Sequence, residues 1–127
     1  MSDYMNTQCI RLETEYQDVD GIIGYLGKTK VLNEVKEKWG ENYSIYDLNE
    51  ELEKDNLRII NYKNRYYIDI ILHNKWADGE DVSFYMAIYD VNKKIFDFTK
   101  KYGKIHIKNI IILVHSWYNG CEEPYSC

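Results

Sequence analysis

The C-terminal segment 115–127 holds the densest group of side chains that could do chemistry. His115, Cys121 and Cys127 are residue types that bind zinc, but their six-residue spacing matches no compact zinc-binding motif. Cys121 and His115 could also supply a nucleophile and a base. Glu122 and Glu123 oppose this role, because neighbouring carboxylates raise the pKa of a thiol. The segment therefore predicts neither a metal site nor a catalytic residue.

The same segment carries aromatic side chains close to acidic ones. Trp117 and Tyr118 follow the last apolar run, and Glu122 and Glu123 come a few residues later. One interpretation is a patch that binds a protein partner, with aromatic anchors inside an acidic rim. The other is that the aromatic rings cover the end of a sheet. The sequence leaves both interpretations open.

A second group of polar side chains lies between residues 93 and 108, where six lysines accompany one histidine. Lys101, Lys104 and His106 are candidates for binding the phosphate of a small molecule or of a single-stranded nucleic acid. Lysine is also common at hairpin ends and sheet edges, where it discourages aggregation. The pattern favours this second explanation.

Known catalytic motifs are absent from the chain, which has no phosphate-binding glycine loop, GxSxG, HExxH, CxxC or calcium-binding loop. Gly21, Gly24 and Gly27 are evenly spaced but are followed by no GKS or GKT, so they predict turns. This pattern favours a non-enzymatic protein that needs no cofactor or metal. It leaves an enzyme without a recognisable motif as an alternative.

The net charge of −5 is unevenly distributed. Residues 1–56 hold thirteen acidic and six basic side chains, whereas residues 57–127 hold eight acidic and ten basic ones. Asp47, Glu50, Glu51 and Glu53 would make the outer face of a helix acidic. Such a face suits a basic protein partner and repels nucleic acid. The alternative is that the acidic residues only keep the protein soluble.

Hydrophobic periodicity predicts an N-terminal strand followed by two short helices. Alternating apolar residues place the strand at residues 9–16. A first amphipathic helix runs from Thr29 to Gly40, with Glu34 and Lys38 spaced for an i,i+4 ion pair. A second helix begins at Ser44, which Asp47 completes as a capping box, and stops at Asn56.

From Leu57 onward the period changes to two, which predicts hairpins. The strand pairs are 57–62 with 66–72, and 82–90 with 95–99. The last strand, 105–117, is apolar on both parities and is expected in the middle of the sheet. The fold class is therefore α+β, with an antiparallel sheet of about five strands built from hairpins. The expected core residues of the hairpins are Tyr66, Ile68, Ile70, Leu72, Val82, Phe84, Met86, Ile88, Phe96 and Phe98.

Length and composition indicate a single domain spanning residues 1–127. The longest apolar run, 110–114, is too short to span a bilayer, and the N-terminus resembles no signal peptide. Three cysteines make a disulfide scaffold a poor fit and suggest reduced thiols. These features predict a cytoplasmic protein and leave its oligomeric state open.

The preferred function is a non-enzymatic inhibitor that occludes a basic site on a protein partner, as toxin-immunity proteins and phage inhibitors of host defence do. The class follows from small size, acidity, thirteen tyrosines and the missing catalytic motifs. A first alternative is a small-molecule or nucleotide-binding protein or enzyme with a pocket lined by tyrosine and lysine. A second is a winged-helix regulator, because two helices precede a hairpin.

Overall fold

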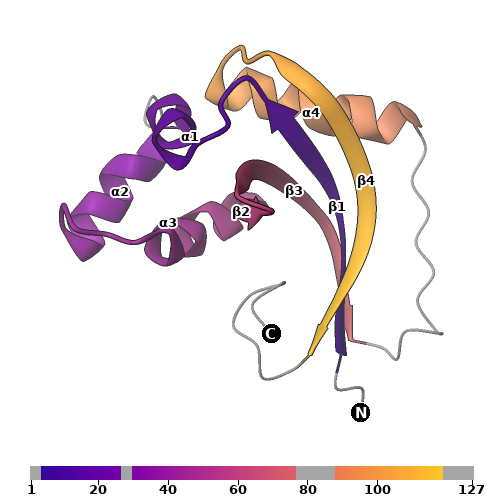
Figure 1. Cartoon of the computed structure of the whole chain (residues 1–127), viewed down its shortest axis with the longest axis horizontal. Helices are drawn as coiled ribbons and strands as arrows, with labels where there is room; N and C mark the ends of the chain where they lie inside the picture. The colour runs from indigo at the N-terminus through magenta and orange to yellow at the C-terminus, as the bar shows by residue number, and fades with distance from the viewer. Residues whose placement is uncertain (1–3, 27–29, 77–87, 119–127) are drawn as a thin grey trace.

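The computed structural model describes residues 4–26, 30–76 and 88–118. Four strands form one antiparallel sheet, and helices gather beside it (Figure 1). None of the helices in the described ranges is both long and apolar enough to cross a membrane. The elements in chain order are β1 (Tyr4–Thr14), α1 (Val19–Leu26), α2 (Lys30–Trp39), α3 (Ile45–Leu52), the 3-10 helix η1 (Glu53–Asp55), β2 (Leu57–Tyr62), β3 (Arg65–Trp76), α4 (Ile88–Tyr102) and β4 (Ile107–Tyr118).

The strand order is β2-β3-β1-β4, so β1 and β3 are central and β2 and β4 form the edges. The connectivity is that of a β-α-β-β-α-β motif, in which α1, α2, α3 and η1 together make the first connection. The predicted α+β class with an N-terminal strand and an antiparallel sheet is confirmed. The details differ, because the described residues form four strands and four α-helices.

The core lies on one face of the sheet. Ile10 and Leu12 of β1 pair in register with Ile70 and Ile68 of β3, and all four side chains are buried. Because alternate strand residues share a face, these side chains form one apolar surface for the helices to cover. The helices contribute Ile22, Tyr25, Leu26, Val35, Leu48, Leu52, Val91, Phe98 and Tyr102 to the same cluster.

The two predicted helices correspond to α2 and to α3 continued by η1, whereas Thr29, the predicted start of the first, lies outside the described residues. Ser44 accepts a hydrogen bond from the Asp47 backbone N–H, and Asp47 accepts one from the Ser44 N–H, which completes the capping box of α3. Gly40, with φ of +82°, follows α2, and Asn56, with φ of +59°, ends η1. Local sequence therefore set these boundaries.

The predicted hairpin at 57–72 is also confirmed, with β3 extending to Trp76. Lys63 and Asn64 connect the strands with φ of 52° and 63°, as a two-residue hairpin turn requires.

The prediction of turns at the N-terminal glycines was wrong for Gly21 and Gly24, which lie in α1. Asp18 accepts a hydrogen bond from the Gly21 N–H at 2.7 Å and so caps the first turn of this helix. Burial of Ile22, Tyr25 and Leu26 on one side then favours the helix over turns. Gly27 lies outside the described residues.

The second predicted hairpin was wrong where it is described, because 88–102 is the helix α4. Val91, Phe98 and Tyr102 are buried and Ile95 is partly buried, which is the spacing of one helical face. Phe96, which the hairpin interpretation placed in the core, is 63% exposed. Residues 82–87 of that hairpin lie outside the described residues.

The prediction that the last strand occupies mid-sheet was also wrong. β4 lies at an edge and pairs with β1, and β1 takes the place between β3 and β4. The apolar side chains on both parities of β4 therefore do not reflect burial on both faces. Ile110, Ile111, Ile112 and Val114 are 39–48% exposed.

Candidate functional site

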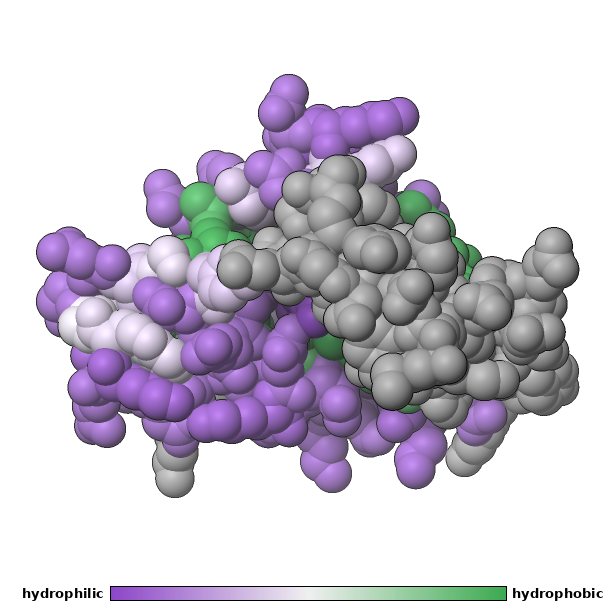
Figure 2. All heavy atoms as spheres, turned by 90° about the horizontal axis from the view of Figure 1, so that it is seen from below, coloured by the Kyte–Doolittle hydropathy of each residue, from purple (hydrophilic) through white to green (hydrophobic). Residues whose placement is uncertain are grey.

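The helices α2 and α3 form an acidic layer, defined here as residues 30–56, with eight Asp or Glu residues and four lysines, a net charge of −4. α2 contacts α3, and α3 contacts β2 at one edge of the sheet. In the view from below, the left part of the molecule, where Figure 1 places α2 and α3, is mostly hydrophilic (Figure 2). Amphipathic helices produce such a layer, because their apolar sides turn to the sheet and leave the charges outside.

The predicted acidic residues differ in their availability within this layer. Glu51 is 4% exposed and binds Lys54 at 2.8 Å and Lys38 at 3.4 Å, so its predicted exposure was wrong. The hydrogen bond from Lys54 lowers the pKa of Glu51, which keeps this carboxylate ionised. Lys38 therefore bonds to Glu51, not to the expected Glu34. Glu53 is exposed and paired with Arg58.

The remaining carboxylates of the layer include Glu34 and Glu37, which were not among the predicted binding residues. Glu34, Glu37 and Glu50 are exposed and belong to none of the ion pairs among the described residues. The charges of Glu34 on α2 and Glu50 on α3 both help to raise the pKa of Lys54, after its hydrogen bond to Glu51. In the sequence, the three-residue spacing of Glu34 and Glu37 was the feature that indicated two carboxylates on the polar side of α2.

An aromatic side chain accompanies these acids on α3. Tyr46 is 42% exposed and lies one helical turn before Glu50. Residues four apart share a face of a helix, so the ring and the carboxylate are neighbours on the surface.

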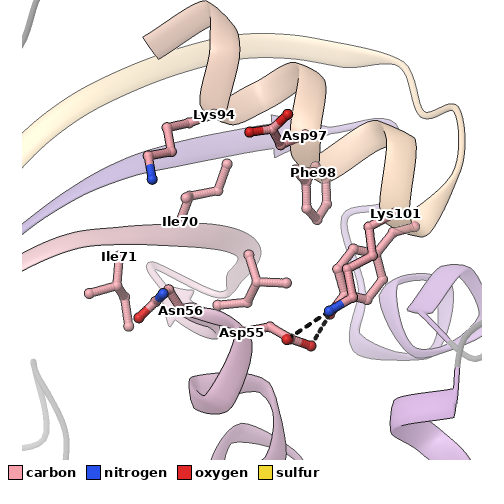
Figure 3. A pocket seen from close by; sticks show the side chains of 10 residues that line it. Asp55, Asn56, Ile70, Ile71, Lys94, Asp97, Phe98 and Lys101 are labelled. Carbon is pink, nitrogen blue, oxygen red and sulfur yellow. Dashed lines mark hydrogen bonds and ion pairs between the residues drawn. The ribbon is translucent and has the colours of Figure 1, made fainter. Parts of the chain in front are cut away.

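A hollow of about 180 Å³ lies between α4 and the start of β2 (Figure 3). Lys101 binds Asp55 at 2.7 Å, and the Tyr102 hydroxyl donates to Asp55 at 2.9 Å. The hydrogen bond from Lys101 is the main cause that lowers the pKa of Asp55. The rest of the lining is mixed in charge and polarity and consists of Asn56, Leu57, Ile70, Ile71, Lys94, Asp97 and Phe98.

This hollow does not assemble the predicted phosphate site. Lys101 lines it, but Lys104 and His106 do not. The Lys101 ammonium already has a carboxylate partner, and Asp97 adds a second negative charge to the lining. The volume is also below the roughly 300 Å³ at which typical ligand pockets begin.

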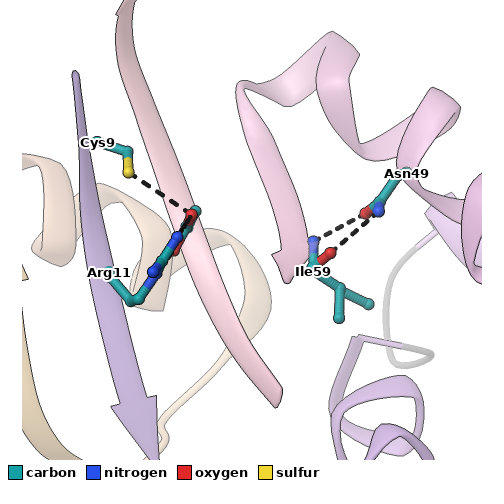
Figure 4. A network of polar contacts seen from close by, with 5 residues as sticks. Cys9, Arg11, Asn49 and Ile59 are labelled. Atoms are coloured by element: carbon teal, nitrogen blue, oxygen red, sulfur yellow. Dashed lines mark hydrogen bonds and ion pairs between the residues drawn. The ribbon is translucent and has the colours of Figure 1, made fainter. Parts of the chain in front are cut away.

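Figure 4 shows a buried polar cluster that includes Cys9 and Arg11 of β1. Because successive strand residues face opposite sides of the sheet, this cluster lies on the face opposite Ile10 and Leu12. Arg11 donates two hydrogen bonds of 2.8 Å to Asp69, and both side chains are at most 5% exposed. The Cys9 thiol donates to the same carboxylate at 3.5 Å. Burial, followed by the charge of Asp69, raises the pKa of Cys9 to about 12, so this thiol is a poor nucleophile.

The predicted aromatic part of the partner surface lies at the other edge of the sheet from α3. Trp117 and Tyr118 end β4, in register with Met5 and Tyr4. The structure describes their backbone only, and Glu122 and Glu123 lie outside the described residues. α3 packs beside β2, whereas Trp117 and Tyr118 end β4 at the opposite edge of the sheet.

Among residues whose side chains are described, no group of three or more His, Cys, Asp or Glu is placed to hold a metal ion. The side chains of His115, Cys121 and Cys127 lie outside that set. Comparison of the chain with protein-family models, with curated proteins and with solved structures gives no match.

Proposed function

We propose that this protein is a non-enzymatic binding protein whose acidic layer occludes a basic site on a protein partner. The observation that supports this most directly is the set of exposed carboxylates, Glu34, Glu37 and Glu50, on two helices packed side by side. Fixed charges on a rigid surface attract an oppositely charged partner before contact and speed its association.

Short-range affinity in this proposal comes from Tyr46. An exposed aromatic ring next to carboxylates is the composition of a binding hot spot with a charged rim. Trp117, Tyr118, Glu122 and Glu123 stay a separate prediction, because a partner would have to reach around the sheet to contact both regions. Occlusion needs no reactive group, and immunity proteins and inhibitors of defence systems act in this way.

The two alternatives from the sequence have weaker support. A nucleotide site would need the basic side chains to converge, and of Lys101, Lys104 and His106 only Lys101 lines the hollow. A winged-helix regulator would present α3 to DNA, but α3 and η1 carry exposed Glu50 and Glu53, which repel phosphate.

The test compares two variants that each lose three carboxylates. The first changes Glu34, Glu37 and Glu50 to Gln on the acidic layer. The matched control changes the exposed residues Asp20, Asp90 and Asp97 to Asn, which alters net charge equally but on α1 and α4. Glu51 is left intact, because its loss would leave two lysines without their partner.

A partner is first captured from lysate with wild-type protein, and association rates are then measured by surface plasmon resonance. We expect the layer variant to associate about tenfold more slowly at low salt, with the difference shrinking as salt screens the charges. The control should behave as wild type. Equal salt dependence in the layer variant and wild type would refute the proposal.

A further inference from the structure

The two edges of the sheet differ in how their backbone groups are satisfied. At the β2 edge, the Asn49 side chain donates to the Ile59 carbonyl at 3.0 Å and accepts from the Ile59 N–H at 2.8 Å (Figure 4). This amide imitates a neighbouring strand and closes the edge to further pairing. A strand from another molecule cannot bind there without displacing α3.

The β4 edge has no such cover among the described residues, where β4 pairs only with β1. The Ile110 N–H donates to the Asn109 side chain at 3.0 Å, which directs it away from β1. Because outward and inward N–H groups alternate along an antiparallel edge strand, those of Ile112 and Val114 also point outward. Within the described residues, β4 therefore offers backbone groups that pair with no other strand, together with half-exposed aliphatic side chains.

We propose that β4 pairs antiparallel with β4 of a second copy of this chain, around a two-fold axis at Ile112. In this register Ile110 of one copy lies opposite Val114 of the other, and Ile111 lies opposite Leu113. Each aliphatic side chain therefore contacts an aliphatic side chain of the second copy. The two four-stranded sheets become one continuous sheet. Twelve-residue strands pair along roughly 40 Å, a seam long enough for many backbone hydrogen bonds.

Charge and symmetry favour a second copy as the occupant. The segment 109–114 carries no charge, and the chosen register places Lys108 opposite Ser116, so like charges do not meet at the seam. A head-to-tail contact from β4 to β2 would build a filament, but Asn49 closes the β2 edge. The symmetric contact uses both open edges and stops at a dimer.

The dimer would also display two acidic layers at opposite ends, because α3 packs at the edge farthest from β4. This inference rests on the β4 edge and does not depend on the proposed function of the layer.

The experiment measures the mass of the full chain by size-exclusion chromatography with light scattering, at up to about 100 µM. Wild type should elute as a dimer. Ile112→Lys and Ile112→Glu each place like charges at the two-fold axis and should be monomeric, whereas their equimolar mixture should restore a dimer. Phe96→Lys, which adds a charge at an exposed apolar position on α4, should stay dimeric.

A further variant distinguishes loss of the dimer from unfolding of the monomer. Ile112→Pro removes an N–H that points away from β1, so it should leave the monomer folded by circular dichroism while abolishing the dimer. The proposal is overturned if wild type is monomeric throughout. It is equally overturned if the charged variants stay dimeric, or if their mixture fails to pair.

Discussion

Replacing Asn49 by Ala removes the side chain that closes the β2 edge, and its effect follows directly from two hydrogen bonds. Asn49 is 5% exposed and Ile59 is 2% exposed, so water does not readily replace the lost amide. The substitution leaves the Ile59 N–H and carbonyl without partners. The penalty is therefore that of burying two unsatisfied backbone groups.

The magnitude can be worked out from those two groups. Each buried group left without a partner costs about 1–3 kcal/mol. Alanine recovers about 0.5 kcal/mol, because it favours a helix more than asparagine does. We therefore expect the free energy of unfolding to fall by about 3 kcal/mol, which corresponds to roughly 10 °C in Tm for a domain of this size. The protein should still fold at 25 °C.

The assay is urea unfolding followed by far-ultraviolet circular dichroism, with the midpoint and slope fitted together. Asn33→Ala is the matched control, because Asn33 is exposed on α2 and its replacement changes only helix propensity. It should raise stability slightly. If the free energy of unfolding of the Asn49→Ala variant lies within about 0.5 kcal/mol of the wild-type value, the two hydrogen bonds do not stabilise the β2 edge and the reasoning fails.

Three further predictions concern buried polar groups. Asp69→Asn should lower stability by about 3–5 kcal/mol, since it removes the carboxylate charge from a buried ion pair with Arg11, and chemical denaturation will measure this. The Cys9 thiol should resist disulfide reagents at pH 8 in the folded protein and react only in denaturant, as peptide mapping can show, because burial raises its pKa to about 12. Burial also raises the pKa of Tyr25 from 10.0 to about 12, so the folded state favours the neutral phenol. Stability from this group should be intact below pH 10 and lost as the pH rises toward 12. Melting curves should show less of this alkaline loss in Tyr25→Phe, which also loses the hydrogen bond to the Gly103 carbonyl.

Local chemistry explains why some elements were predictable. The Ser44 and Asp47 capping box, the stop at Asn56 and the spacing within α2 depend on residues a few positions apart. The 57–72 hairpin is similar, because a short polar turn joins two alternating segments. Such features are fixed by hydrogen bonds and periodicity within one element.

The region of α4 shows where periodicity misled the prediction. The alternation of Phe96 and Phe98 is compatible with a strand, but Val91, Phe98 and Tyr102 also fit a helical face. Gly103, with φ of +108°, supplies a helix C-cap, since its N–H donates to the Thr99 carbonyl. Packing of this face on the sheet selected the helix.

The candidate surface was predictable only in part. The acidity of the α3 region was visible in the sequence, whereas the burial of Glu51 depends on Lys38 from a different helix. The contribution of Glu34 and Glu37 depends on α2 and α3 packing together. Neither relation appears in the spacing along the chain.

The sequence by itself determined the α+β class, the capped helices, the first hairpin and the excess of acidic residues in the N-terminal half. Each follows from residues close together in the chain. Only the tertiary structure decided that β1 separates β3 from β4, that Asn49 closes the β2 edge and that β4, within the described part of the chain, pairs with β1 alone. Strand order and edge exposure depend on contacts between residues about 100 positions apart, such as Ile10 with Ile112. Local periodicity carries no information about those contacts, because an apolar edge strand and a buried central strand have the same pattern.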